Sequence, residues 1–281
     1  MEKLQASKPK FLNIACGAVY VDSREWENVD YISNDSRHVR KMNVLKKLNP
    51  SQGQYEAIYC SHFVEHIPLS YILDFLKRCY TLTKPGGILR IVLPDAEFLL
   101  REYLRYKDSG NRLLADFAFV NFLDQCVRRK SGGRLGEIYF KVANGELHDL
   151  ENYLFFLNGS LELEKLDCSR RLTLIQKIKR VLSSSTYLTS SLENYYIRAI
   201  TRLLPHGFRV QNISFADIGE LHHWMYDFDQ ISTLLKESGF SKVERMSFNT
   251  SNRTDGIFHQ LDIHNEKPRK GNHQLFVEAY K

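Results

Sequence analysis

The sequence predicts an α/β protein whose mostly parallel β-sheet is interrupted by a long helical insertion. Short apolar runs bounded by turn residues alternate with amphipathic helical patterns before residue 96 and again after residue 226. Continuous apolar strands of this kind are typical of parallel sheets that are covered on both faces. Between these two parts, helical patterns separated by Gly, Ser and Asn replace the alternation. We therefore expect a sheet domain formed by residues 1–95 and 227–281, and a mostly helical insertion over residues 96–226 that caps the carboxyl edge of the sheet.

The part of the chain before the insertion predicts strands that are joined by short turns. Residues 11–30 combine a buried strand, a tight turn at Gly17 and a second strand that ends at Asp30. Further strands are expected within residues 37–48, 54–60 and 88–93. Ligands bind just beyond the carboxyl ends of parallel strands, so the side chains that follow these strands are candidates for a site.

An amphipathic helix is expected over residues 69–81. Apolar residues, Ile72 and Phe75 among them, recur there at spacings of three and four. The segment KPGG follows at residues 84–87. Because proline cannot continue a helix and glycine supplies a left-handed cap, we expect this segment to end the helix.

The rest of the chain predicts more helices and a closing pair of strands. Helical segments are expected inside the insertion at residues 96–106, 112–130, 146–157, 171–183 and 191–204. After the insertion, residues 228–238 predict an amphipathic helix that ends at Gly239. Strand patterns at residues 241–248 and 273–280 have no helical pattern between them, so we expect them to pair antiparallel at the edge of the sheet.

The turn after the first strand limits the kind of ligand. A dinucleotide-binding turn needs three glycines, which let the backbone approach a pyrophosphate, and an acid roughly 20 residues further on. Here Gly17 is the only glycine of the turn, bulky residues occupy positions 19–21, and Asp30 follows after 13 residues. Such a turn favours a nucleoside cofactor without phosphates, and S-adenosylmethionine is the obvious one.

Composition excludes several classes of protein. The chain has 281 residues, 43% of them hydrophobic, and can bury a substantial core. Its five cysteines are an odd number without C-x-x-C spacing, which predicts a reducing, cytoplasmic location and no disulfide framework. No apolar run approaches the ~20 residues that a membrane span requires, and no apolar segment of a signal peptide follows the charged start. The net charge of +6 permits an acidic partner, and a solvated surface explains it equally well.

Several motifs together carry a resemblance to a known family. They are IACG at residues 14–17, the acid Asp30, CSHFVEHIP at residues 60–68 and LTKPGGILRIVLPD at residues 82–95. In this order and spacing they resemble the class I S-adenosylmethionine-dependent methyltransferases, specifically the type 11 group, over residues 11–94 and 227–281. The resemblance implies a Rossmann-like sheet of seven strands whose last strand is antiparallel, with S-adenosylmethionine as the cofactor.

A finer pattern resembles a bacterial subgroup of that family, whose members often accompany genes of cell-surface polysaccharide biosynthesis. It consists of W-x-N-x-D at residues 26–30, His-x-x-Glu-His at residues 62–66 and HHWMYD at residues 222–227. Two positions depart from the usual family pattern. Ala15 stands in place of the first glycine of the G-x-G turn, and Asn43 stands where an acid is expected.

The resemblance and the chemistry of the cofactor indicate a set of binding residues. The backbone of residues 15–18 is expected to pack against the methionine moiety, Asp30 to accept both ribose hydroxyls, and Asn43 to hydrogen-bond the adenine amino group. The alternative for Asp30 is an acid that merely ends a strand in a turn. The expected cofactor-binding residues are Ala15, Cys16, Gly17, Ala18, Asp30, Asn43, Ser61 and His62.

Three residues after the fourth strand are candidates for catalysis: His62, Glu65 and His66. Methyl transfer is an in-line displacement, which depends mostly on alignment, but a hydroxyl acceptor must also lose a proton. His62 is the predicted general base, since an imidazole titrates near neutral pH. The spacing also permits a metal site, and a capping role without chemistry is a third alternative. We predict no metal, because a histidine in the first position would weaken a hard Mg²⁺ site.

A second group of residues is expected to bind the acceptor. Aromatic faces suit the apolar C–H patches of sugar rings, and histidines suit hydroxyls, so the segment before the last helix is predicted to line the cleft. The expected acceptor-binding residues are Asp95, His222, His223, Trp224 and Tyr226. Asp95 has the alternative of a helix N-cap, and the two aromatic residues have the alternative of packing the insertion onto the sheet.

These inferences lead to an O-methyltransferase that modifies a sugar or a glycan-linked hydroxyl during surface polysaccharide assembly. Its partner is then a small-molecule or glycan acceptor. Two alternatives stay open: a methyltransferase of a small metabolite or of RNA, and a catalytically inactive scaffold with a methyltransferase fold. Nucleic acid is not expected as a partner, because the aromatic strand signature and the G-x-x-G clamp of RNA-binding modules are absent from the sequence. The sequence does not indicate an oligomeric state.

Overall fold

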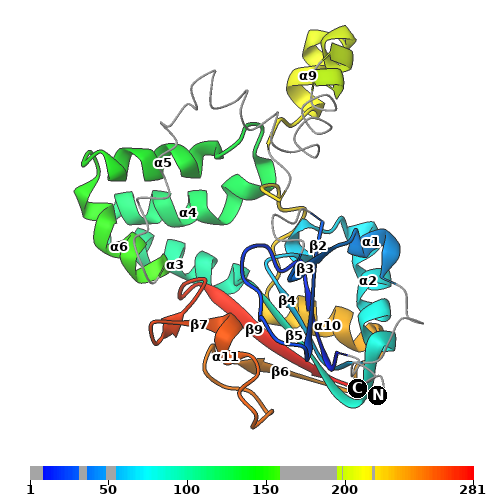
Figure 1. Ribbon diagram of the computed structural model, residues 1–281. Helices are drawn as coiled ribbons and strands as arrows, with labels where there is room; N and C mark the ends of the chain where they lie inside the picture. Colours follow the sequence, from blue (N-terminus) through cyan, green and yellow to red (C-terminus); the bar gives the residue numbers. More distant parts are fainter. Residues whose placement is uncertain (1–8, 32–36, 49–54, 159–194, 198, 217–218) are drawn as a thin grey trace, which may run out of the picture.

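A seven-stranded β-sheet lies at the centre of the computed structural model (Figure 1). The structure describes residues 9–31, 37–48, 55–158, 195–197, 199–216 and 219–281. The sheet consists of β1 (Phe11–Ile14), β2 (Trp26–Asp30), β3 (Val39–Lys41), β4 (Tyr55–Ser61), β5 (Thr83–Pro94), β6 (Lys242–Met246) and β9 (Gln274–Tyr280). A separate small sheet pairs β7 (Ile263–His264) with β8 (Lys267–Pro268).

The strand order is β3-β2-β1-β4-β5-β9-β6. Neighbouring strands from β3 to β5 are parallel, whereas β9 runs antiparallel between β5 and β6. The predicted fold, a Rossmann-like sheet of seven strands with an antiparallel last strand, is therefore confirmed. The two closing strands pair antiparallel as expected, and β6 forms the edge of the sheet while β9 lies inside it.

Both faces of the sheet are buried, as the apolar strands predict. On one face, α2 (Leu69–Leu82) and α10 (Phe228–Glu237) contribute apolar side chains, such as Phe75, to a cluster with residues of β1, β4, β5 and β9. The short helix α1 (Val44–Lys47) joins the same cluster. On the other face, Phe258 and the helix α11 (His259–Asp262) pack against β1, β4 and β9.

A buried ion network anchors the segment between β6 and β9. Arg90 of β5 is 1% exposed, and its guanidinium donates to Asp262 Oδ2 at 2.7 Å and to Glu278 Oε1 at 2.8 Å. The Tyr59 hydroxyl donates to the other oxygen of Asp262 at 2.7 Å. An unpaired buried charge is strongly unfavourable, so these reciprocal bonds are what allow two carboxylates and a guanidinium to lie inside the protein.

Between β5 and α10, most of the residues that the structure describes are helical. The helices include α3 (Ala96–Asp108), α4 (Arg112–Val127), α5 (Gly133–Ala143), α6 (His148–Asn158) and α9 (His206–Asn212). In Figure 1, α3 to α6 form a group beside the end of the sheet, and α9 projects away from it. The group has an apolar cluster of its own, which includes Phe117 and Leu154. Leu157 at the end of α6 accepts a 2.7 Å hydrogen bond from the Asn272 nitrogen, just before β9.

The predicted helices are present where the structure describes them, with two additions among the described residues of the insertion, and with the short helices α1 and α11 outside it. The segments at 96–106, 112–130 and 146–157 correspond to α3, α4 and α6, and α4 ends at Val127. The segment 171–183 lies outside the described residues, and within 191–204 residues 195–197 and 199–203 are helical. The sequence did not predict α5 or α9. In α5 the glycines at its start and at Gly136 lower helix propensity, which made the pattern indicate a loop.

The predicted glycine cap after residues 69–81 is wrong. α2 ends at Leu82, and its C-cap residue Thr83 has extended backbone angles. Thr83 pairs with Tyr55 of β4, so strand pairing ends the helix and no left-handed turn is needed there. Gly86 does have a φ of +74°, but it lies inside β5, three residues beyond the cap.

The structure also describes most of the cysteines and gives the length and apolar character of the helices. The cysteines among the described residues, Cys16, Cys60, Cys79 and Cys126, are all free. Within the described ranges, no helix has the length and apolar character that a membrane crossing requires.

Candidate active site

The carboxyl ends of the parallel strands meet at one edge of the sheet, where most of the predicted site residues lie. β1 has β2 on one side and β4 on the other, so the order of the strands reverses at β1. A reversal of this kind opens a crevice between the loops that follow the two neighbouring strands. The loops after β1, β2 and β4 carry all the residues predicted for cofactor binding except Asn43, which follows β3.

The turn after β1 leaves open space beside Asp30. Gly17 has a φ of +56°, and a Cβ atom at this position would meet no heavy atom within 4 Å. The Gly17 nitrogen donates to Asp30 Oδ2 at 2.8 Å, which ties the end of β1 to the end of β2. Ala15 is also left-handed, with a φ of +53°, although a residue with a Cβ atom adopts this conformation at a cost. An open turn and a half-buried carboxylate fit a nucleoside with a ribose diol.

Two buried asparagines hold this loop: Asn28 of the W-x-N-x-D pattern, and Asn13, which the sequence analysis did not single out. Asn28 Nδ2 donates to the Val21 carbonyl at 2.9 Å, and Asn28 Oδ1 accepts from the Val21 nitrogen at 3.3 Å. Asn13 Nδ2 donates to the Val19 carbonyl at 3.1 Å and to Asn28 Oδ1 at 3.2 Å. Asn13 stands in an otherwise apolar strand, and Asn28 is a buried polar residue of β2. A polar residue inside a strand that is expected to be buried needs hydrogen-bond partners, and this could have indicated their role from the sequence.

The other predicted cofactor residues surround the same edge. The Met42 nitrogen donates to the Asp30 carbonyl at 2.7 Å. Asn43, the next residue in the chain, therefore lies close to Asp30. Asn43 is the N-cap residue of α1, yet its side chain makes no capping hydrogen bond. Cys16 is buried, and burial together with nearby Asp30 raises the pKa of its thiol to about 12. Cys16 is therefore a neutral packing residue, while Ala18 is exposed.

His62 occupies a strained position directly after β4. Its φ is +51°, and its nitrogen donates to the Val92 carbonyl of β5 at 2.8 Å. Nδ1 lies 3.4 Å from Glu65 Oε1, and Nε2 is buried without a hydrogen-bond partner among the described residues. Burial, followed by the nearby charges of Lys270 and His273, lowers the pKa of His62 well below its usual value. The imidazole is consequently neutral at pH 7, which is the form that can accept a proton, but the lowered pKa also makes it a weaker base than a histidine that titrates near neutral pH.

Glu65 is a fully buried carboxyl group. The residue is 0% exposed, and neither carboxylate oxygen has a hydrogen-bond partner in the described part of the chain. Burial raises the pKa of Glu65 to about 8. Its main-chain carbonyl, in contrast, accepts hydrogen bonds from the nitrogens of His223 at 2.7 Å and Trp224 at 3.3 Å.

The structure brings the segment before α10 onto the residues that follow β4. The His66 ring nitrogen Nδ1 lies 2.8 Å from the Leu221 carbonyl, and the rings of His66 and His222 meet edge to face at 4.7 Å. His222 is only 3% exposed, and burial lowers its pKa to about 3. Glu65, His66 and His222 each place one ligand atom within 4.8 Å of the other two. The predicted catalytic and acceptor-binding groups are thus neighbours.

The remaining predicted acceptor residues divide into exposed and buried ones. His223 is exposed, Trp224 is 42% exposed, and the Trp224 indole nitrogen donates to Gln230 Oε1 at 3.2 Å. Tyr226 is buried in the cluster beneath the sheet, and its hydroxyl has no hydrogen-bond partner among the described residues. Burial and Glu65 raise the pKa of Tyr226 to about 12. Only His223 and Trp224 therefore present side chains to solvent.

Asp95 acts as a helix cap. Its Oδ1 accepts from the Phe98 nitrogen at 3.2 Å at the start of α3, and its Oδ2 is paired with Arg245. Asp95 is 2% exposed, and burial raises its pKa. Both carboxylate oxygens are thus used within the protein, as the N-cap alternative predicts.

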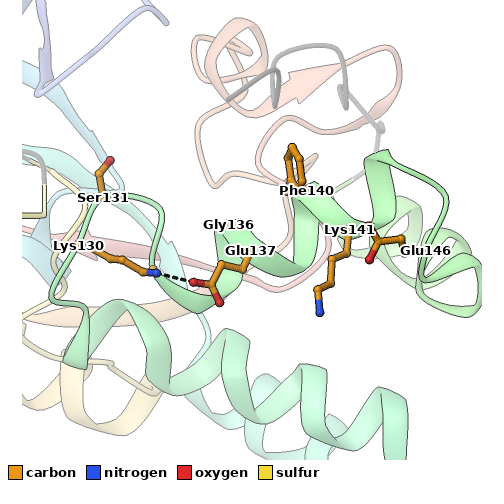
Figure 2. Close-up of a pocket in the computed structure, with 8 residues that line it drawn as sticks. Lys130, Ser131, Gly136, Glu137, Phe140, Lys141 and Glu146 are labelled. Carbon is orange, nitrogen blue, oxygen red and sulfur yellow. Dashed lines mark hydrogen bonds and ion pairs between the residues drawn. The ribbon is translucent and has the colours of Figure 1, made fainter. Parts of the chain in front are cut away.

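A groove of about 400 Å³ lies on the helical part of the chain rather than at this edge (Figure 2). It is lined by Lys130, Ser131, Gly133, Gly136, Glu137, Phe140, Lys141 and Glu146. None of the residues predicted for cofactor, acceptor or catalysis lines it. The groove belongs to α5 and the turns on either side of that helix.

Comparison with known proteins agrees with the fold. Residues 11–125 match a family described as a methyltransferase domain. No curated protein matches the chain. A SAM-dependent methyltransferase from Archaeoglobus fulgidus is 12% identical, with 98% of this chain and 87% of that chain covered and a TM-score of 0.39. PKMT2 from Rickettsia typhi, solved in complex with AdoHcy, is 11% identical, with 97% of this chain and 48% of that chain covered and a TM-score of 0.37.

Residues 11–125 match a methyltransferase domain, and the strand order agrees with the fold expected of an S-adenosylmethionine-dependent methyltransferase. The open turn at Gly17 and the half-buried Asp30 fit that cofactor. The low identities of the solved structures do not bear on the acceptor.

Proposed function

We propose that this S-adenosylmethionine-dependent methyltransferase methylates a hydroxyl group of a sugar or a glycan-linked acceptor, in the biosynthesis of a surface polysaccharide. The observation that carries the proposal is the position of His62. Ile14 of β1 is level with Cys60 of β4, so His62 lies beside the turn that fits the cofactor. A hydroxyl has to lose a proton as it attacks, and His62 offers a neutral imidazole with an unpartnered Nε2 at that place.

Each residue of the site would have a separate role in binding or in proton transfer. When bound, the cofactor supplies an electrophilic methyl group on a positively charged sulfur. Asp30 would hold the ribose and Asn43 the adenine, and the backbone of residues 15–18 would pack against the methionine moiety. His62 Nε2 accepts the proton of the acceptor hydroxyl. Glu65, 3.4 Å from Nδ1 of the same ring, positions the imidazole.

The acceptor would contact the exposed side chains that follow His222. The backbone of His223 and Trp224 is fixed on the Glu65 carbonyl, and the Trp224 ring is held by its bond to Gln230. A fixed, partly exposed indole next to a general base suits a sugar ring, because its face can cover apolar C–H groups while the hydroxyl reaches His62. This arrangement favours a hydroxylated ring over a flexible apolar acceptor.

The test is an acceptor screen with the full chain, in which S-adenosylhomocysteine is quantified for sugars and for amines of similar size. We expect turnover with sugar hydroxyls. His62→Gln should lower kcat by at least about 100-fold, the contribution usual for a general base, with the KM for the cofactor unchanged. His206→Gln on α9 is the matched control, because His206 is exposed and lies outside the site. Turnover of amines alone, or full activity of His62→Gln, would overturn the proposal.

A second variant tests the acceptor contact. Trp224→Ala should raise the KM for a sugar acceptor about tenfold and leave the KM for the cofactor unchanged, because loss of one aromatic contact is worth about 1 kcal/mol. An unchanged acceptor KM would remove Trp224 from the acceptor site. It would leave the role of His62 to be decided by the first experiment.

A further inference from the structure

We infer that Glu65, His66 and His222 form a binding site for one divalent metal ion of the zinc class. The three side chains come from two distant parts of the chain, the turn after β4 and the segment before α10. One ligand atom of each lies within 4.8 Å of the other two, and the described residues contain no hydrogen bond between these side chains. Three donor groups that converge without bonding one another leave room for a common partner.

Each of the two histidines has its Nδ1 next to a protein group, as metal-binding histidines commonly have one ring nitrogen. Nδ1 of His66 lies 2.8 Å from the Leu221 carbonyl, which is an acceptor only, so this nitrogen carries the proton. Nδ1 of His222 lies 3.4 Å from the sulfur of Met225, a weak acceptor. In each ring Nε2 then has a lone pair. Metal-binding histidines are commonly fixed in this way, with one nitrogen donating to a protein group and the other facing the ion.

Glu65 supplies the second, independent observation. It is completely buried, yet both of its oxygens lack a hydrogen-bond partner among the described residues. A buried polar group without a partner is destabilising by roughly 1–3 kcal/mol, and native structures rarely keep one without a reason. The buried hydroxyl of Tyr226, whose pKa responds to Glu65, is unpartnered as well. A cation bound to Glu65 would satisfy the group that the protein leaves open.

The distances and the donor set fit zinc and similar ions. Tetrahedral ligands that are each ~2.1 Å from one ion lie ~3.4 Å apart, so a spread of up to 4.8 Å requires pairs of ligand atoms to close by up to about 1.4 Å. Two imidazoles and one carboxylate are ligands of Zn²⁺, Fe²⁺ and related ions, whereas Mg²⁺ and Ca²⁺ prefer oxygen ligands. Three protein ligands also leave a coordination position open.

From the sequence we predicted no metal, because His62 in the first position of the His62, Glu65 and His66 pattern would weaken a hard Mg²⁺ site. The structure instead brings His222, 156 residues beyond His66, to the ligand set in place of His62. Such an ion would fasten the segment that returns from the helical part of the chain to the end of β4. It would thereby hold His223 and Trp224 at the acceptor side of the site.

The test measures metal binding directly and needs no acceptor, so its outcome is independent of the proposed function. The untagged full chain is stripped with a chelator, dialysed, and titrated with Zn²⁺ and with Co²⁺. We expect about one equivalent of metal per chain, a thermal transition that rises with added Zn²⁺, and a visible Co²⁺ spectrum of a nitrogen and oxygen site. His222→Gln and Glu65→Gln should each weaken binding by at least about tenfold.

His223→Gln is the matched control for metal binding, because His223 adjoins His222 but is exposed and outside the cluster. It should bind Zn²⁺ as tightly as the unchanged chain. The Co²⁺ spectrum of the unchanged chain keeps the test valid if a variant fails to fold. No stoichiometric metal and no Co²⁺ spectrum, or equal affinity in His222→Gln, would overturn the site.

Discussion

The main-chain nitrogen of His223 donates a 2.7 Å hydrogen bond to the carbonyl oxygen of Glu65. This contact joins the turn after β4 to a segment more than 150 residues further along the chain, and the Trp224 nitrogen shares the same carbonyl at 3.3 Å. The residues proposed for proton transfer and those proposed for acceptor binding are therefore fixed to each other through the backbone. We therefore expect a substitution in one of these segments to shift the position of the other.

The first prediction concerns cofactor binding at Asp30. Asp30→Ala should weaken the binding of S-adenosylhomocysteine by at least about tenfold, which corresponds to about 1.4 kcal/mol, because the carboxylate is expected to accept the ribose hydroxyls. Isothermal titration calorimetry measures the affinity. Asp229→Ala in the exposed first turn of α10 is the control and should bind normally. Normal affinity in Asp30→Ala would mean that the ribose lies elsewhere.

The second prediction concerns the close contact between α6 and the chain before β9. A Cβ atom at Gly271 would lie 1.9 Å from the Leu157 carbonyl oxygen, and Gly271 has a φ of +95°. Gly271→Ala should therefore lower the free energy of unfolding by about 2 kcal/mol or more, since both backbone strain and a displaced neighbour contribute. Denaturant unfolding measures the change.

Gly207→Ala is the matched control for this substitution. Gly207 lies in α9, and a Cβ atom there would meet nothing within 4 Å. The same chemical change should be neutral or slightly stabilising, because alanine favours a helix by about 1 kcal/mol over glycine. If the two variants were equally stable, the contact at Leu157 would not be as tight as described.

The third prediction concerns the buried ion network. Arg90→Met removes the guanidinium and leaves the carboxylates of Asp262 and Glu278 buried without their charge partner. Breaking a buried pair in this way should lower the free energy of unfolding by about 3–5 kcal/mol. Arg101→Met, which removes an exposed pair with Glu97, should change it by no more than about 0.5 kcal/mol. Similar losses in the two variants would argue against the network.

The fourth prediction is a pH dependence that comes from His273. Burial lowers the pKa of His273 to about 4, whereas the unfolded chain binds a proton near pH 6.5. The unfolded state therefore binds more protons between these values, so stability is complete above pH 6.5 and decreases as the pH falls towards 4. His273→Gln, which can still donate to the Leu157 carbonyl, lacks this loss.

The measurement is the thermal midpoint of both proteins from pH 7.5 down to pH 4. The midpoint of the unchanged chain should fall several degrees further than that of His273→Gln over this range. Other buried groups titrate in both proteins, so the difference between the two curves isolates His273. Parallel curves would show that His273 has an ordinary pKa.

The sequence alone predicted the elements and the residues that are close along the chain. The periodic patterns at residues 69–81 and 228–238 are helices, and the acid 13 residues after Gly17 accepts a bond from that turn, because local spacing determines both. The end of β4 was also predictable. The strand pattern predicted that His62 directly follows a strand, and the structure has it directly after β4.

Only the tertiary structure decided which distant side chains meet. The contact of His222 with His66, the pairing of Arg90 with Asp262 and Glu278, and the close approach of Gly271 to Leu157 join residues more than 100 positions apart. No periodicity in the sequence reports such contacts, because they depend on how helices and strands pack after they form. The sequence therefore determined the fold and the sheet edge of the candidate site, whereas packing decided that the buried Glu65 lies close to His66 and His222 as well as to His62.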